Sequence, residues 1–228
     1  MSDLASIGKK FKTSKNRTGF IPIYEKYFQD YKNKKINILE IGIDDGESLR
    51  LWRDYFTNAN IVGLDIYPKN FIIDGVKMFQ GDQSNISDLK KITDEYKKFD
   101  IIIDDGSHVS KQTIKSFKYL FDYLNFDGLY VVEDLQTSYL PNFGGSRINL
   151  KKKTSMNFLK SLTDSINYEL NDRPFFKKNK FDGFVKYVHF FQNIAFIKKD
   201  KSVHFFYKNN IKNTLINKLK KLISLIYK

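Results

Sequence analysis

The chain has 228 residues, a formal net charge of +13 and no cysteine. This length suits one α/β domain with additions better than two full domains, and the missing thiols exclude disulfides and zinc bound through cysteine. Residues 1–20 contain no long apolar run, and no stretch approaches the roughly 18 apolar residues of a membrane-spanning helix. We therefore expect neither a secretory signal nor a transmembrane segment, and a cytoplasmic protein.

The positive charge is almost entirely lysine. Arginine occurs only at Arg17, Arg50, Arg53, Arg147 and Arg173. Proteins that read nucleic acids usually depend on arginine for bidentate contacts. A lysine-rich, asparagine-rich composition is also what an AT-rich genome produces, so the charge alone does not favour a nucleic-acid partner.

In chain order, residues 1–18 are polar and basic, and we expect them to be loose or to form a lid ahead of a helix over 20–32. Five short apolar runs typical of buried parallel strands follow, at 36–42, 59–66, 76–82, 99–108 and 128–135, and the fourth runs into a loop. Segments with helical spacing lie at 48–56, 86–98, 111–125 and 154–170, and the second should begin at a cap formed by Ser84 or Ser87. This alternation is typical of a doubly wound parallel sheet with right-handed crossovers.

Residues 184–200 hold two β-rich runs separated by Gln192 and Asn193, which predicts a terminal antiparallel hairpin. The expected whole is one domain over 1–208, with a mostly parallel seven-stranded sheet and residues 1–32 as a lid and helix. Residues 209–228 differ in character, because apolar residues from 211 to 226 share one helical face with lysines opposite. Such a basic amphipathic helix can pack on the domain, contact a second copy or lie on a membrane surface.

The loop after the first strand, EIGIDDG (40–46), lies where open parallel sheets bind their ligands. Its glycines let the backbone approach a ligand closely, whereas its aspartates would repel a pyrophosphate. S-adenosylmethionine carries positive sulfonium and amine groups and no phosphate. The loop therefore favours this cofactor over NAD, and its spacing departs from G-x-G-x-x-G.

The next two strand ends add candidate cofactor contacts. Asp65 can accept both ribose hydroxyls, and Asp82 can meet an adenine amine. Each of these residues alone is weak evidence for a cofactor site, but acids at the ends of successive strands are stronger evidence together. The candidate cofactor set is Glu40, Gly42, Ser48, Asp65, Asp82 and Gln83.

The fourth and fifth runs carry the sharpest signal. They end in Asp104, Asp105 and His108, and in Glu133 and Asp134. If these strands are neighbours they lie about 4.8 Å apart, so three or four acids meet, and like charges that close oppose ionisation unless a cation is present. An all-oxygen set favours Mg²⁺ or Mn²⁺ over zinc. The alternative is that one or two of these acids only cap a helix or bind loop amides.

The chemistry explains why a histidine would need a metal ion beside it. A histidine has a pKa of about 6.5, and water, taken as a stand-in for an alcohol, has one near 15.7. The gap corresponds to roughly 12 kcal/mol, which a divalent ion holding the hydroxyl can reduce. His108 is then the candidate general base, with Asp104 as its nearest substitute, whereas we expect His189 and His204 to be structural or surface residues.

These segments resemble a known family. The runs LEIGIDDGESLRLWRDYF, GLDI, GDQSN, FDIIIDDGSH and GLYVVEDLQTSY, preceded by KTSKNRTGFIPIYEKYF, are similar to the macrocin and mycinamicin sugar O-methyltransferases over roughly residues 10–145. The resemblance implies a Rossmann-like class I methyltransferase fold that uses S-adenosylmethionine and Mg²⁺. It also implies His108 as base and Asp105, Glu133 and Asp134 as metal ligands. The chain departs from the family in a short loop after the first strand and in lacking the large extra N-terminal domain of some members.

The expected function is therefore metal-dependent transfer of a methyl group from S-adenosylmethionine to a hydroxyl of a sugar or nucleotide-activated intermediate. The composition disfavours a macrolide, so a bacterial surface polysaccharide or another natural product is the expected context. Three alternatives stay open: an RNA methyltransferase, a cephalosporin-hydroxylase-like relative with different chemistry, and a non-catalytic cofactor-binding module with a lipid-binding tail. A small sugar-like molecule is the expected partner, and the tail could add a membrane contact or a homo-oligomer contact.

Overall fold

The computed structural model describes residues 3–147, 153–168 and 178–201. The expected C-terminal helix over 209–228 and His204 lie outside the described residues. Among those ranges, the structure contains no helix that is long and apolar enough to cross a membrane.

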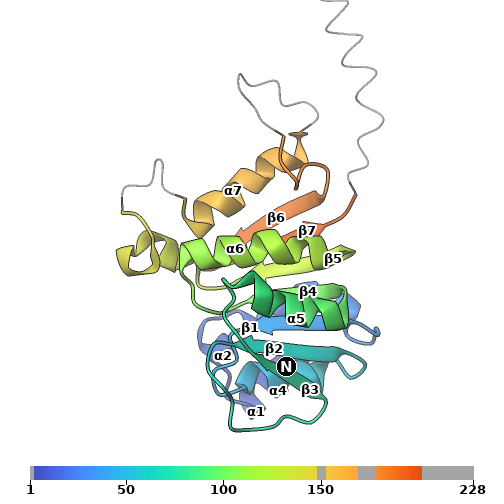
Figure 1. The fold of residues 1–228 in the computed structure, drawn as a ribbon. Coiled ribbons are helices and arrows are strands. Elements are labelled where there is room, and N and C mark those ends of the chain that lie inside the picture. The colour runs from blue at the N-terminus through green and yellow to red at the C-terminus, as the bar shows by residue number, and fades with distance from the viewer. Residues whose placement is uncertain (1–2, 148–152, 169–177, 202–228) are drawn as a thin grey trace, which may run out of the picture.

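Seven strands form one sheet, as the sequence predicts (Figure 1). They are β1 (Asn37–Ile41), β2 (Asn60–Asp65), β3 (Val76–Gln80), β4 (Phe99–Asp104), β5 (Leu124–Val132), β6 (Val185–Phe191) and β7 (Ile194–Lys199). Their order across the sheet is β3-β2-β1-β4-β5-β7-β6. The first five pair in parallel, and β7 is antiparallel to both β5 and β6, which confirms the expected hairpin. The order of the strands changes direction at β1, because β2 and β3 lie on one side of it and β4 and β5 on the other. The carboxyl ends of these parallel strands meet at one edge, where ligands of such sheets bind.

Helices cover both faces of the sheet. They are α1 (Asp3–Lys10), α2 (Ser14–Arg17), α3 (Ile21–Phe28), α4 (Glu47–Tyr55), α5 (Ile86–Tyr96), α6 (Ser110–Leu120) and α7 (Ser155–Ile166). The helices α5, α6 and α7 pack on one face, and α1, α3 and α4 pack on the other (Figure 1). Because side chains alternate along a strand, Ile101 and Ile103 of β4 enter the core on the α4 side, whereas Ile102 enters the core on the α6 side.

The amino-terminal segment differs from its prediction. Residues 3–17 are not loose, because α1 packs into the core with Leu4 fully buried and α2 buries Lys15. Leu4, Ile7 and Phe11 recur at helical spacing and all contact the same core. This segment is therefore part of the domain, and it brings a lysine to the edge of the sheet.

Two element boundaries also differ from the sequence prediction. Helix α5 is capped by Asn85 rather than by a serine, because the side chain of Asn85 accepts a hydrogen bond from the backbone nitrogen of Ser87. The helix expected over 111–125 ends at Leu120, followed by a 3₁₀ turn and a β5 that already begins at Leu124. The register of β4 against β5 shifts after Phe99, which accommodates the longer strand.

Candidate active site

A cavity of about 520 Å³ opens at the carboxyl ends of the parallel strands. Its volume falls within the usual range of small-molecule sites. The predicted site residues in its lining are Gly42, Ser48, Asp65, Asp82, Gln83, Asp105, His108 and Asp134. Three others, Glu40, Asp104 and Glu133, are not in the lining and lie almost fully buried.

Asp65 ends β2 and organises the loop after β1. Its Oδ2 accepts hydrogen bonds from the backbone nitrogens of Ile43 (2.9 Å) and Asp44 (3.2 Å), and Lys69 Nζ lies 2.9 Å from the same oxygen. Its Oδ1 accepts from the backbone nitrogen of Tyr67 at 2.9 Å. Burial opposes ionisation of Asp65, but these donors outweigh it and hold its pKa below the ordinary value. The carboxylate is thus charged at the cavity wall.

Gly42 is where β1 meets the loop that follows β4. Its φ is +92°, and a Cβ there would lie 2.1 Å from the carbonyl oxygen of Asp105. The position therefore requires glycine, both for its backbone conformation and for the close approach of the two loops. The loop that carries Gly42 and the loop that carries Asp105 are in direct contact.

Gln83 and Asp82 lie at the cavity wall but also bind within the protein. Gln83 Nε2 donates to Asp104 Oδ1 at 3.0 Å, and Gln83 Oε1 accepts from the backbone nitrogen of Ser107 at 2.7 Å. Asp82 Oδ1 accepts from the backbone nitrogen of Ser84 at 2.6 Å. Gln83 therefore ties the loop after β3 to the loop after β4.

Asp104 does not fit the expected role of substitute base. It continues the alternation of β4 onto the α6 face, where Ser116 Oγ donates to its Oδ2 at 2.8 Å. It is 2% exposed and lies outside the cavity lining. Burial raises the pKa of Asp104 to about 6, although hydrogen bonds from Ser116 and Gln83 oppose the rise. Its position indicates a structural role, because it is buried outside the cavity lining.

His108 and Asp134 face each other across the ends of β4 and β5. His108 Nε2 lies 3.5 Å from Asp134 Oδ2, and both residues have left-handed backbones. One ligand atom from each of Asp105, His108 and Asp134 can be chosen so that all lie within 4.8 Å of one another. Two carboxylates and an imidazole at that spacing could hold a divalent cation.

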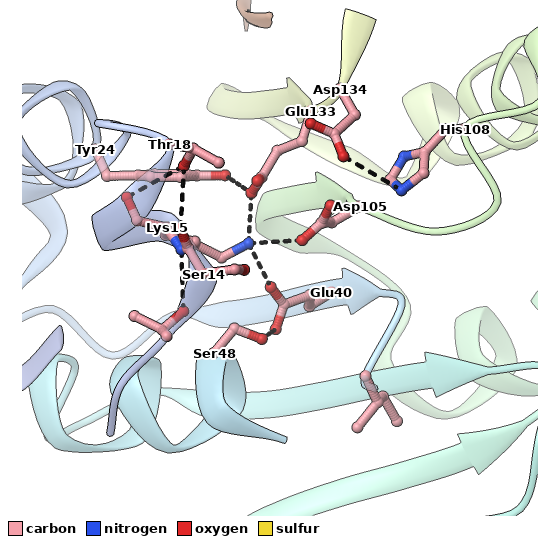
Figure 2. Close-up of polar contacts among 12 residues, drawn as sticks. Ser14, Lys15, Thr18, Tyr24, Glu40, Ser48, Asp105, His108, Glu133 and Asp134 are labelled. Carbon is pink, nitrogen blue, oxygen red and sulfur yellow. Dashed lines mark hydrogen bonds and ion pairs between the residues drawn. The ribbon is translucent and has the colours of Figure 1, made fainter. Parts of the chain in front are cut away.

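Glu133, predicted as a third acidic ligand, lies deeper than this group and is not part of it. Its Oε1 lies 2.6 Å from Lys15 Nζ and also accepts a hydrogen bond from the hydroxyl of Tyr24 (Figure 2). Burial and the neighbouring charge of Asp105 raise the pKa of Glu133, while Lys15 and Tyr24 oppose the rise. The metal-ligand set Asp105, Glu133 and Asp134 stays a prediction, with Glu133 set deeper than the other two acids and His108 beside Asp134 at the rim.

Lys15 is the centre of a buried cluster of acids. Its Nζ lies 2.8 Å from Asp105 Oδ2 and 3.5 Å from Glu40 Oε1, in addition to its contact with Glu133 (Figure 2). Burial alone would lower the pKa of Lys15, but the three carboxylates outweigh it and hold that pKa well above its ordinary value. Lysines are almost never fully buried unless paired, and this one has three partners.

Glu40 connects this cluster to the cofactor side of the cavity. Ser48 Oγ donates to its Oε2 at 2.8 Å, whereas its buried Oε1 lies 3.5 Å from the Lys15 ammonium and accepts no hydrogen bond of ordinary geometry from the described residues. Burial raises the pKa of Glu40, and Lys15 opposes the rise. Glu40 therefore keeps an acceptor oxygen that is not saturated.

Sequence reasoning missed Lys15 and Tyr24. Both lie in the segment KTSKNRTGFIPIYEKYF, which resembles a known family but offers no acid or histidine to single out. The remaining histidine among the described residues, His189, is placed as expected: it stacks on Tyr187 at the sheet edge, and its Nδ1 lies 2.7 Å from the hydroxyl of Tyr27.

Comparison with known proteins agrees with this architecture. No family model matches the chain. It is 36% identical over 214 residues to mycinamicin VI 2''-O-methyltransferase of Micromonospora griseorubida, covering 88% of this chain and 53% of that protein. It is 38% identical over 190 residues to demethylmacrocin O-methyltransferase of Streptomyces fradiae, covering 79% and 48%. A solved structure of MycE methyltransferase from the mycinamycin biosynthetic pathway, in complex with Mg and SAH, superposes with a TM-score of 0.84 at 35% identity, covering 89% of this chain and 56% of that one.

The seven-stranded sheet with a terminal antiparallel pair and a ligand cavity at its carboxyl edge defines a Rossmann-like methyltransferase fold. Within that class, the sequence and the structure show that the chain is a relative of the macrocin and mycinamicin sugar O-methyltransferases. It spans about half the length of the relatives that it matches.

Proposed function

We propose that this protein is an S-adenosylmethionine-dependent O-methyltransferase that methylates a sugar hydroxyl with the help of a divalent cation. One observation carries the proposal. His108, Asp105 and Asp134 meet at the rim of the same cavity that Asp65 lines. A candidate general base, a candidate cation site and a cofactor-type carboxylate therefore converge on one space, as metal-assisted methyl transfer to a hydroxyl requires.

The residues at the rim fit a divalent cation. Asp105 and Asp134 offer carboxylate oxygens, and Glu133 keeps its second oxygen, Oε2, apart from the Lys15 and Tyr24 contacts, which both fall on Oε1. Asp105 and Asp134 would hold the ion, with Glu133 Oε2 behind them. When bound, such an ion lowers the pKa of a coordinated hydroxyl. His108 then accepts the hydroxyl proton, and Asp134, 3.5 Å from its Nε2, stabilises the resulting imidazolium.

The cofactor side of the cavity fits S-adenosylmethionine through complementary charge. Asp65 presents a charged carboxylate to the ribose hydroxyls, and the loop after β1 exposes Asp44 and Asp45. Glu40, behind the cavity wall, retains the unsaturated oxygen Oε1. A ligand with positive sulfonium and ammonium groups suits this acidic wall, and a pyrophosphate does not.

A sugar hydroxyl is the proposed acceptor. The relatives above 30% identity carry names of enzymes that methylate glycosides of macrolides, such as mycinamicin VI, or rhamnosyl tetracenomycin. For this lysine-rich chain we propose a nucleotide-activated sugar or a glycoside of a surface polysaccharide or natural product. The RNA methyltransferase alternative rests on net charge alone, and methylation of RNA does not require the cation group at the rim.

Transfer of a labelled methyl group from S-adenosylmethionine tests the proposal. The acceptors would be a panel of nucleotide-sugars and simple rhamnosides, each with MgCl₂ or with excess EDTA, and an RNA transcript would serve as the competing acceptor. We expect label in a sugar only when Mg²⁺ is present. If the RNA is labelled even in excess EDTA and no sugar is labelled, the proposal is wrong and the protein is an RNA methyltransferase.

A further inference from the structure

The ammonium of Lys15 places a positive charge beside carboxylates that a bound cation would otherwise neutralise. It contacts one oxygen of Glu133 (2.6 Å) and one of Asp105 (2.8 Å), the same two side chains that stand behind and within the proposed cation group. Its side chain is 1% exposed. The charge is therefore held in a low-dielectric interior, where an unpaired carboxylate is costly.

The two contacted carboxylates each keep their second oxygen apart from Lys15. Lys15 meets Asp105 through Oδ2 and Glu133 through Oε1, and the hydroxyl of Tyr24 is directed at that same Oε1 (Figure 2). Both donors thus fix the orientation of the Glu133 carboxylate. An arriving cation can use the other oxygens without displacing Lys15.

The backbone around Lys15 is itself anchored. Its nitrogen donates to Thr13 Oγ1 at 3.4 Å, and its carbonyl accepts from Thr18 Oγ1 at 3.2 Å and from the nitrogen of Phe20 at 3.0 Å. Leu4 in the preceding helix is fully buried. The position of the ammonium is therefore set by the amino-terminal segment as a whole.

From these contacts we infer that Lys15 is a positioning residue, a resident internal cation that holds the acids Glu40, Asp105 and Glu133 separated and oriented while no divalent ion is bound. The inference rests on the proposed function, because it assigns Lys15 a task in the cation site. Lys15 keeps the site ready to bind a metal ion, and the fold does not need that ion for its stability. Without Lys15, a divalent cation would have to supply the missing positive charge.

Thermal unfolding with and without MnCl₂ tests this inference without any methyl acceptor. The wild-type melting temperature should be nearly the same in EDTA and in MnCl₂. Lys15→Met should melt about 10 °C lower in EDTA, since removing one partner of a buried pair is strongly destabilising, and MnCl₂ should restore a large part of the loss. Lys10→Met, which removes an exposed lysine paired with Asp54, is the matched control and should show neither effect.

Two further variants keep the inference testable if Lys15→Met does not fold. Lys15→Met combined with Glu133→Gln removes the ammonium together with the carboxylate nearest to it, and it should fold in EDTA and lose most of the response to MnCl₂. Tyr24→Phe removes only the hydroxyl that orients Glu133, and it should weaken Mn²⁺ binding several-fold in calorimetry. A Lys15→Met protein that melts at the wild-type temperature in EDTA, or one whose loss MnCl₂ does not restore, would overturn the inference. Absence of methyl transfer by the wild type would overturn the proposed function and leave these measurements unaffected.

Discussion

His108 and Asp134 face each other with Nε2 3.5 Å from Oδ2, and each has a left-handed backbone, with φ of 55° and 52°. Such conformations are uncommon for residues other than glycine and cluster at functional sites. In this protein they turn two side chains from neighbouring strand ends toward one point above the cavity.

The base assignment predicts a large loss of rate in His108→Ala. The variant should bind S-adenosylmethionine and Mn²⁺ but methylate roughly 10²–10⁴-fold more slowly, the usual contribution of a general base. Single-turnover methyl transfer measures this directly. His189→Ala is the control, because it removes an imidazole 2.7 Å from Tyr27 at the sheet edge and should retain full rate. An equal loss in both variants would mean that the effect is not specific to the site.

The cation group predicts that Asp134→Asn weakens metal binding. We expect Mn²⁺ affinity in calorimetry to fall by more than about tenfold, since even groups behind the ligands typically contribute about 10–100-fold. Asp45→Asn is the matched control, because Asp45 lines the same cavity but lies outside the cation group. Methyl transfer that persists at full rate in excess EDTA would contradict the metal-dependent mechanism.

The cofactor assignment predicts that Asp65→Ala weakens S-adenosylmethionine binding by about 1–3 kcal/mol, the contribution of charge-assisted hydrogen bonds. Isothermal titration calorimetry would measure it. Lys69→Met separates two explanations, because it removes the ion pair at 2.9 Å but leaves the carboxylate in place. We expect the lysine variant to bind at least as tightly as the wild type. Equal weakening in both variants would show that the ion pair, and not the ribose contact, determines the affinity for S-adenosylmethionine.

The raised pKa of Asp104 predicts a specific dependence of the free energy of unfolding on pH. Its pKa is about 6 in the folded protein and near 3.8 when unperturbed, so between these values the folded state binds more protons than the unfolded state. Its contribution to the free energy of unfolding therefore falls as pH rises from about 4 to 6, by roughly 3 kcal/mol in all. Asp104→Asn removes this titration.

Urea unfolding across pH 4–7.5 would show the effect as a growing difference between Asp104→Asn and the wild type. The variant should gain relative stability toward neutral pH, while retaining an acceptor for Gln83. Parallel pH profiles would show that Asp104 does not titrate in this range. Because the measurement concerns folding, it also tests the structural role that the position of Asp104 indicates.

Much of the architecture could be predicted because short segments of the sequence carry the signals for individual strands, helices and turns. The apolar runs that became β1, β2 and β4 end in glycine or aspartate, and parallel pairing then brings those ends to one edge. The turn at Gln192 and Asn193 likewise marks the hairpin. The acids at the ends of β4 and β5 followed from the same reasoning, since these strands are neighbours as expected.

The features that the sequence did not predict depend on contacts between residues far apart in the chain. Lys15 looks like one more surface lysine, and its partners Asp105 and Glu133 lie 90 and 118 residues away. Asp104 and Asp105 are adjacent, so they point to opposite faces, but only the packing of α6 shows which face is closed. The helical spacing of Leu4, Ile7 and Phe11 was the available signal for the buried amino-terminal helix.

The close contact between Gly42 and the carbonyl of Asp105 has a thermodynamic consequence. The loop beside the cofactor and the loop beside the cation share this contact, where even a methyl group would lie 2.1 Å from the carbonyl oxygen. If closing one loop shifts the other, the two ligands are linked, and linkage is reciprocal. The factor by which S-adenosylmethionine changes the affinity for Mn²⁺ must then equal the factor by which Mn²⁺ changes the affinity for S-adenosylmethionine, so two titrations in opposite order measure one coupling energy.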